Sequence, residues 1–68
     1  MNVIVNGDQT ELDSGATLAD VVMMMGRQRM GSGVAAALNG ELVTRSEWQD
    51  RRVTEGDRIE ILGAAQGG

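Results

Sequence analysis

The 68-residue sequence contains no cysteine, histidine, lysine or tyrosine. Without cysteine, the chain has no disulfide, no thiolate nucleophile and no cysteine-based metal site. Without the other three residue types, it also lacks the usual general base, the Schiff-base amine and the phenol. Carboxylates, arginines and hydroxyls are the side chains that remain for chemistry. We therefore expect a protein that is not an enzyme and that binds no metal or cofactor of its own.

Charge and hydropathy argue against two further classes of partner. The net charge is -4, whereas nucleic-acid-binding domains carry clustered positive charge. The arginine pairs at Arg27 and Arg29 and at Arg51 and Arg52 are typical of a solvated surface. No apolar run is longer than that of residues 21–25, which is much shorter than the roughly 20 residues that span a bilayer. We expect no nucleic-acid partner, no membrane partner and a cytoplasmic location.

Two Asn-Gly pairs, at residues 6–7 and 39–40, each separate two β-prone runs. Asn-Gly favours a type I′ turn, because both central residues of that turn need a positive φ. Each pair therefore predicts a β-hairpin. A further turn at residues 54–57 leads into a final strand in which Ile59 and Ile61 would face inward. The predicted strands cover residues 1–6, 8–13, 34–38, 41–43 and 58–62.

A helix is predicted to begin after Thr17. The hydroxyl of Thr17 can cap the helix, and Asp20 stands three residues later, where an acidic side chain completes a capping box. Gly26 fits the position that ends a helix. The apolar residues that follow the cap have the spacing of one helix face: Leu18, Val21, Val22 and Met25.

Three other segments invite a ligand-binding interpretation. The methionines at residues 23–25 could bind a soft ion, but consecutive helical residues diverge, so packing is the simpler interpretation. Residues 27–33 could cradle a phosphate, but they lack the Lys-Ser/Thr ending of a P-loop and predict a mobile connection. Thr44 and Glu47 have capping-box spacing and predict a short helical turn carrying Trp48. This lone aromatic residue could stack on a ligand, but it fits a lid on the core better.

The order of elements predicts an α+β fold. The predicted order is a hairpin, a helix, two strands, a helical turn and a last strand. These elements enclose a core best when the helix packs across one face of a mixed sheet. The first and last strands then lie parallel at the centre, in strand order 2-1-5-3-4. This is the β-grasp, or ubiquitin-like, arrangement, and we expect it to occupy residues 1–63. The predicted core consists of Val3, Val5, Leu12, Leu18, Val21, Val22, Met25, Val34, Ala36, Leu38, Val43, Trp48, Val53, Ile59 and Ile61.

The same strand order predicts an apolar patch on the open face of the sheet. Ile4, Leu62, Ala35 and Ala37 would point outward from three adjacent strands. A contiguous exposed apolar patch is typical of an interaction site, whereas scattered apolar residues need no explanation. We interpret the four residues as a docking patch for a protein partner, with scattered surface residues as the alternative.

The chain ends in five small or polar residues: Ala64, Ala65, Gln66, Gly67 and Gly68. The two glycines can pass through a channel too narrow for other residues, and the segment predicts a flexible tail. From Gly63 to Gly68 the chain spans about 20 Å when it is extended. Its α-carboxylate, with a pKa of about 3.3 to 3.7, is an anion at neutral pH and must be activated to react, most simply as an acyl-adenylate. A frayed terminus is the alternative.

These features together resemble the sulfur carrier proteins of thiamine biosynthesis, the ThiS family. The most specific matches are Arg-Ser-Glu-Trp at residues 45–48 and Gln-Gly-Gly at residues 66–68. The chain departs from the family at residues 23–32, and at Ala36 and Ala65, where the family often has valine. The other segments that carry the resemblance are Asn6 with Gly7, Thr17 with Leu18, residues 34–41 and residues 55–62.

The resemblance implies a co-substrate without an active site of its own. An E1-like adenylyltransferase would use ATP to convert the Gly68 carboxylate to an acyl-adenylate. A persulfide from a cysteine desulfurase system would then deliver sulfur, giving a thiocarboxylate, and thiazole synthase would take up that sulfur. The tail residues Gly67, Gln66, Ala65 and Ala64 would enter the partner's active site.

Other assignments remain open at this stage. The small subunit of molybdopterin synthase uses the same thiocarboxylate chemistry, although those chains tend to be longer and Gln66 argues against them. A carrier of sulfur for cysteine or siderophore synthesis is a further possibility. Outside this class, the chain could be a ubiquitin-like protein modifier or a plain β-grasp binding module.

Overall fold

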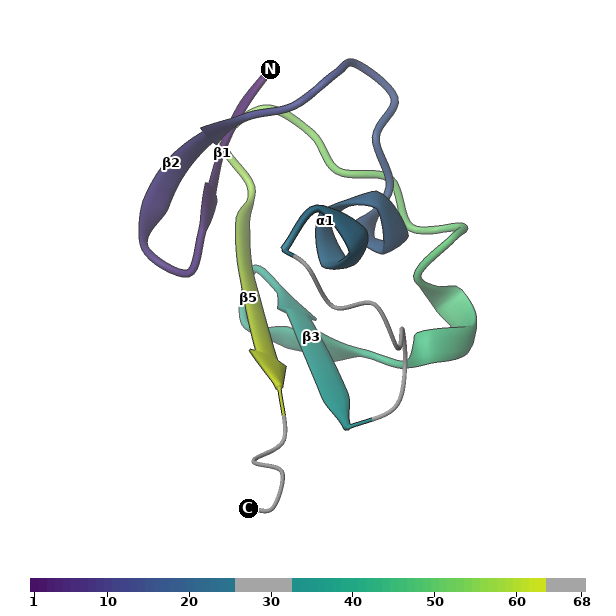
Figure 1. The fold of residues 1–68 in the computed structure, drawn as a ribbon. Coiled ribbons are helices and arrows are strands. Elements are labelled where there is room, and N and C mark those ends of the chain that lie inside the picture. Colours follow the sequence, from purple (N-terminus) through teal and green to yellow (C-terminus); the bar gives the residue numbers. More distant parts are fainter. Residues whose placement is uncertain (26–32, 64–68) are drawn as a thin grey trace.

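The structure is a computed structural model that describes residues 1–25 and 33–63. Figure 1 shows the strands of this part of the chain around a helix, α1. The predicted boundary between domain and tail, after residue 63, coincides with the limit of the described residues and stays a prediction. The elements are β1 (Asn2–Val5), β2 (Asp8–Glu11), α1 (Leu18–Met24), β3 (Val34–Leu38), β4 (Glu41–Val43), a 3-10 helix η1 (Arg45–Glu47) and β5 (Arg58–Gly63).

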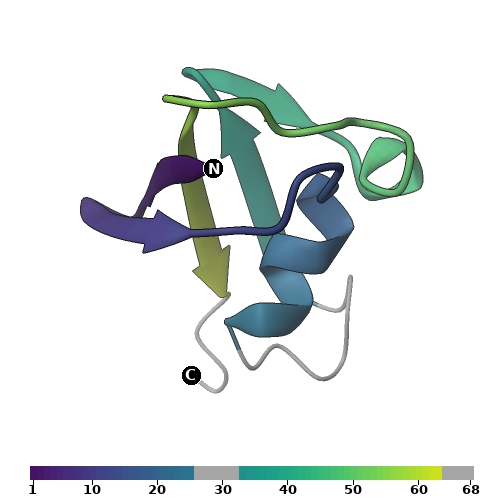
Figure 2. The same cartoon turned by 90° about the horizontal axis from the view of Figure 1, so that it is seen from above.

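The strands form one mixed sheet in the order β2-β1-β5-β3-β4. β1 and β5 are parallel at its centre, with Ile4 opposite Arg58 and Val5 opposite Ile59. The other neighbouring strands are antiparallel. The helix α1 packs across one face of the sheet, which Figures 1 and 2 show from two directions. The predicted α+β class, the strand order and the β-grasp arrangement are confirmed.

Both Asn-Gly pairs form the predicted hairpin turns. Asn6 has a φ of 51° and Gly7 a φ of 86°, and the second pair repeats these values, with 52° at Asn39 and 86° at Gly40. Two successive residues with positive φ define the type I′ turn, whose twist matches that of the flanking strands. The strand predicted over residues 8–13 ends at Glu11, after which the chain turns toward α1.

The helix begins at the predicted cap. Thr17 Oγ1 accepts the backbone N–H of Asp20 at 3.3 Å, and Asp20 Oδ2 accepts the N–H of Thr17 at 2.9 Å. The chain between η1 and β5 also holds this end of α1, because the N–H of Leu18 donates to the carbonyl of Arg51 at 2.9 Å. The helix ends at Met24, with Met25 as its last cap residue. The predicted role of Gly26 lies outside the described residues, as do residues 27–32 of the predicted connection.

The second predicted capping box does not form. Thr44 precedes η1 without a side-chain capping bond, and its hydroxyl lies 3.4 Å from that of Ser46. The amide that it would cap, that of Glu47, donates instead to the carbonyl of Thr44 at 2.9 Å. This bond between residues three apart is the 3-10 pattern. The predicted helical turn therefore exists but is closed by its own backbone.

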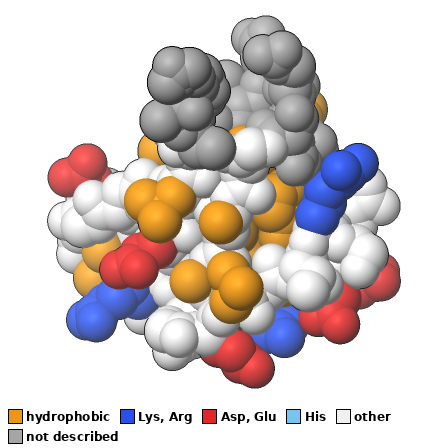
Figure 3. All heavy atoms as spheres, turned by 90° about the horizontal axis from the view of Figure 1, so that it is seen from below, with side chains coloured by type: hydrophobic (Ala, Val, Ile, Leu, Met, Phe, Trp, Pro, Cys, Tyr) orange, Lys and Arg blue, Asp and Glu red, His pale blue; other side chains and the backbone are white. Residues whose placement is uncertain are grey.

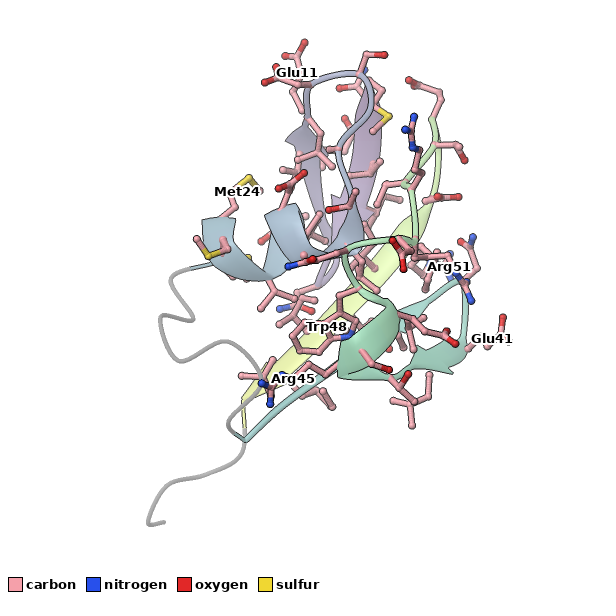
Figure 4. The ribbon with its side chains drawn as sticks, turned by 90° about the vertical axis from the view of Figure 1, so that its right-hand side faces the viewer. Glu11, Met24, Glu41, Arg45, Trp48 and Arg51 are labelled. Carbon is pink, nitrogen blue, oxygen red and sulfur yellow. The ribbon has the colours of Figure 1, made fainter. Side chains whose placement is uncertain are left out.

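The core lies between α1 and the sheet and contains Trp48. The indole is buried, and its Nε1 donates to the carbonyl of Val43 at 2.9 Å. Figure 4 shows Trp48 pointing toward the interior, so the lone aromatic residue serves packing. The predicted core is correct except that Met25 and Val34 are only partly buried, and that two alanines on the helix side were missed. The two missed core residues are Ala16 and Ala19.

Ala16 and Ala19 were missed because neither stands at the spacing that marks the apolar face of the helix. Ala16 and Ala19 lie where the chain enters α1 and where residues 48–53 pass close by: the N–H of Ala19 donates to the carbonyl of Trp48 at 3.1 Å, and the carbonyl of Ala16 accepts from Val53 at 3.0 Å. Larger side chains would separate these segments.

Asp57 joins the turn before β5 to the turn between β3 and β4. Its Oδ2 accepts the backbone N–H of Thr54 at 2.7 Å, and its Oδ1 accepts Asn39 Nδ2 at 3.0 Å. Partial burial raises the pKa of this carboxyl, but the hydrogen bonds from Thr54 and Asn39 outweigh that effect, and the net pKa is lowered from 3.8. The charged carboxylate therefore stabilises the folded state.

We expect the stabilising contribution of the Asp57 carboxylate to be lost in acid. A lowered folded-state pKa means that the unfolded chain binds the proton more readily, so the contribution is complete above pH 3.8 and is lost as the pH falls through the folded-state pKa. Urea unfolding between pH 6 and pH 2 should show a smaller acid-induced loss of stability in Asp57→Asn than in the parent. Parallel pH profiles for the two proteins would contradict this account.

Candidate functional site

The C-terminal tail follows directly from the central strand of the sheet. β5 pairs with β1 on one side and with β3 on the other, up to the partners Val34 and Gly63. The predicted tail residues lie outside the described part of the chain, so their role stays a prediction. The structure does show that the chain reaches them from β5, the strand held on both sides. The tail residues are Ala64, Ala65, Gln66, Gly67 and Gly68.

The side chain of Asn6 holds the later half of β5. Its Oδ1 accepts the N–H of Ile61 at 2.8 Å, and its Nδ2 donates to the carbonyl of Ile61 at 3.2 Å. The two residues are 55 positions apart in the chain. Ile61 lies two residues before Gly63, the last described residue of β5. Sequence reasoning identified Asn6 only as a turn residue.

The side chain of Asn39 holds the beginning of the same strand. Its Oδ1 accepts the N–H of Arg58 at 2.9 Å, while its Nδ2 donates to Asp57. The backbone N–H of Asn39 also donates to the carbonyl of Arg58 at 2.7 Å. The asparagines of both hairpin turns thus contact β5, one at each end of the strand.

The open face of the sheet carries an apolar patch, which we define as Ala35, Ala37, Leu42 and Leu62. Leu62 is opposite Ala35 in the pairing of β3 with β5, and Leu42 is opposite Ala37 in the pairing of β3 with β4. Paired residues point to the same face of a sheet. Leu42 and Leu62 are 70% and 67% exposed. Figure 3 shows hydrophobic side chains gathered in the middle of one face, with charged side chains around them.

The patch differs from the predicted one at two positions. Leu42 belongs to it, although sequence reasoning missed this residue because its partner on β3 depends on the strand register. Ile4 lies on the same face but is opposite Arg58, and Glu60 is opposite Ala37. The exposed side chains of Arg58 and Glu60 therefore separate the half-buried Ile4 from the patch. Of the predicted set, the register groups Leu62, Ala35 and Ala37.

A shallow apolar depression adjoins this patch at the end of β5. Its walls come from the first residues of β3 and the last residues of β5, the two segments that meet where the described chain ends. The lining residues are Gly33, Val34, Ala35, Leu62 and Gly63.

Two further hollows lie away from this face. One is bordered by Arg45, Gln49 and the edge of Trp48, but the indole is buried and offers no face for stacking. The other has acidic borders at Glu11, Asp13 and Asp20. Among residues 1–25 and 33–63, no group of three acidic, histidine or cysteine side chains is arranged to hold a metal ion. Nor does this part of the chain contain a helix long and apolar enough to cross a membrane.

The family model that matches this chain is that of the ThiS family, over residues 3–68. The match therefore covers the fold and continues through the terminal glycine. The chain belongs to the ThiS family. Members of this family are small sulfur carrier proteins.

Solved structures of a ThiS protein support the same assignment. The crystal structure of the thiamine biosynthesis protein ThiS from Geobacter metallireducens has a TM-score of 0.78 and 27% identity, with all of both chains covered. A solution structure of a thiamine biosynthesis protein from the same organism has a TM-score of 0.82 and 27% identity, covering 100% of this chain and 88% of that one. No curated protein matches the chain.

Two features of this ThiS-family chain meet at one strand. The central strand β5 leads toward the C-terminus, and its exposed residue Leu62 belongs to the apolar patch. The patch and the tail are thus joined within a few residues of β5.

Proposed function

We propose that this protein carries sulfur on its C-terminal glycine for formation of the thiazole ring of thiamine. The observation that carries the proposal is the ThiS-family match, which extends through Gly68. The thiamine biosynthesis proteins with the same fold support the choice of pathway. In this function the protein is a co-substrate, and its partners supply the catalytic groups.

The chemistry begins at the α-carboxylate of Gly68. An E1-like adenylyltransferase joins this carboxylate to the α-phosphate of ATP, and pyrophosphate leaves. Conversion to the acyl-adenylate turns an unreactive anion into an electrophile with AMP as its leaving group. ATP is bound and consumed by the partner, so the carrier needs no nucleotide site of its own.

Sulfur then replaces AMP on the same carbonyl carbon. The terminal sulfur of a persulfide, supplied by a cysteine desulfurase system, attacks the acyl-adenylate and forms an acyl disulfide. A thiol cleaves the S–S bond, which releases the thiocarboxylate and leaves a disulfide on the donor side. Thiazole synthase takes the sulfur from the thiocarboxylate, and hydrolysis returns the carboxylate.

The apolar patch is the docking surface in this proposal. Its member Leu62 is followed directly by Gly63, the residue before the tail. A partner that covers the patch therefore also lies beside the start of the tail. The extended length of the tail, about 20 Å, allows Gly68 to reach a recessed nucleotide while the folded domain stays outside. Gly67 and Gly68 cross the narrowest part of the channel, and Ala64 and Ala65 are small enough to follow.

Intact mass spectrometry tests the carried group. A fraction of the protein isolated from cells should be about 16 Da heavier than the sequence mass, the difference between sulfur and oxygen. A variant lacking Gly68 should show no such fraction. A strain that lacks the gene for this protein should grow in medium without thiamine when the thiazole is supplied. Conjugates with other proteins, with no heavier fraction, would make the protein a modifier instead.

Gly67→Ala tests passage of the tail through a narrow channel. The variant should unfold at the same urea concentration as the parent, yet release pyrophosphate with the adenylyltransferase at least about tenfold more slowly, since a displaced reacting group costs that much or more. Ala64→Gly is the matched control, because it makes the tail smaller. Equal rates for Gly67→Ala and the parent would rule out steric threading.

Leu62→Asp tests docking through the apolar patch. The side chain is 67% exposed, so its replacement should change the free energy of unfolding by no more than about 0.5 kcal/mol. The KM of the adenylyltransferase for the carrier should rise about tenfold, as expected for loss of a central interface contact.

Met23→Asp is the control for Leu62→Asp, because Met23 is 58% exposed on α1, away from the open face of the sheet. Both variants add one negative charge, so a general charge effect would appear equally in the two. A KM raised to the same extent by both substitutions would contradict docking through the patch.

A further inference from the structure

The asparagine of the first hairpin turn makes contacts that the turn itself does not require. A type I′ turn accepts Asn, Asp or Gly at its first central position. At Asn6, however, the carboxamide both accepts the N–H of Ile61 at 2.8 Å and donates to the carbonyl of Ile61 at 3.2 Å. Aspartate offers no donor and glycine offers neither group. Only asparagine among these three satisfies both the turn and β5.

The carboxamide continues the ladder between β1 and β5 after β1 has ended. The N–H of Ile4 donates to the carbonyl of Asp57, and the N–H of Asn6 donates to that of Ile59, both at 2.9 Å. A parallel ladder would next bond to Ile61. Because Asn6 turns away with a φ of 51°, its side chain supplies the donor and acceptor that the backbone of a longer β1 would have supplied.

These bonds act at the end of β5 from which the tail departs. On the other side of β5, the first residues of β3 hold the same stretch, with Ala36 opposite Ile61 and Val34 opposite Gly63. This stretch of β5 therefore has a neighbour on each side, and Leu62 and Gly63 follow Ile61 directly. The exposed side chain of Leu62 belongs to the patch, so the same contact sets the patch relative to the start of the tail.

We propose that Asn6 is a positioning residue that fixes the end of β5, and with it the place from which the tail is presented to the activating enzyme. The part concerning the enzyme rests on the proposed function. The part concerning β5 rests only on the bonds between Asn6 and Ile61. Asn6 acts through the strand and touches neither the carboxylate nor the nucleotide.

The chain contains a matched control. Asn39 occupies the same position of the same type of turn, with a φ of 52°, and its side chain also bonds to β5, at Arg58. This contact lies at the opposite end of the strand from the tail. Asn6→Gly and Asn39→Gly therefore remove equivalent side chains and keep equivalent turns, but only the first frees the tail end of β5.

Amide hydrogen exchange tests the contact without any enzyme. In Asn6→Gly, the exchange rate of the Ile61 amide divided by that of Ile59 should rise about tenfold, as loss of one hydrogen bond predicts. The ratio removes any change in overall stability, because both amides belong to the same strand. In Asn39→Gly the ratio should stay at the parent value. An unchanged ratio in Asn6→Gly would overturn the proposal.

Adenylation kinetics test the consequence for the tail. Asn6→Gly should lower kcat about tenfold through misplacement of the carboxylate, with KM close to that of the parent because the patch remains. Asn39→Gly should leave kcat unchanged. Equal kcat values for the two variants would overturn the positioning role. If the parent itself is not adenylated, the proposed function fails, and the exchange ratio still decides whether Asn6 holds β5.

Asn6→Asp is a second variant that keeps the turn and one acceptor. Its carboxylate can still accept the N–H of Ile61 but places a second oxygen against the Ile61 carbonyl. The exchange ratio and kcat should therefore lie between those of the parent and of Asn6→Gly. Values equal to those of the parent would show that the donated bond has no role and would overturn the proposed two-bond contact.

Discussion

The parallel pairing of β1 with β5 organises both the sheet and the core of this protein. It joins residues more than 50 positions apart, as in the 2.9 Å bond from Ile4 to Asp57. Parallel strands cannot be linked by a tight turn, so the intervening chain crosses over the sheet as α1 and supplies the other side of the core. The pairing also makes the last strand a central one, with Ile59 and Ile61 buried beneath the helix.

A central last strand suits a protein of the ThiS family. Strands at the edge of a sheet fray more easily than strands bonded on both sides, and here β5 has neighbours on both sides. In the proposed function, the folded domain supports the terminus while partners supply the chemistry.

Polar contacts around β5 complement the apolar core beneath it. Asn6, Asn39 and Asp57 bond to the backbone or turns at the two ends of the strand. Each occupies a turn for conformational reasons, and each also uses its side chain across the sheet. The buried side chains determine that β5 lies in the sheet, whereas these contacts determine where its pairing begins and ends. The later end matters most for the proposed function, because it leads toward the C-terminal tail.

The turns, the helix start at Thr17 and the alternation of the core strands could be predicted from the sequence, because each depends on residues close together in the chain. The order of these elements then indicated the β-grasp fold. The folded structure was needed to show that Leu42 joins the patch, that Arg58 and Glu60 separate Ile4 from it, and that Asn6 bonds to Ile61. It also decided that the capping box at Thr44 gives way to a 3-10 bond. These features depend on strand register and local backbone closure, which periodicity and turn preferences leave open.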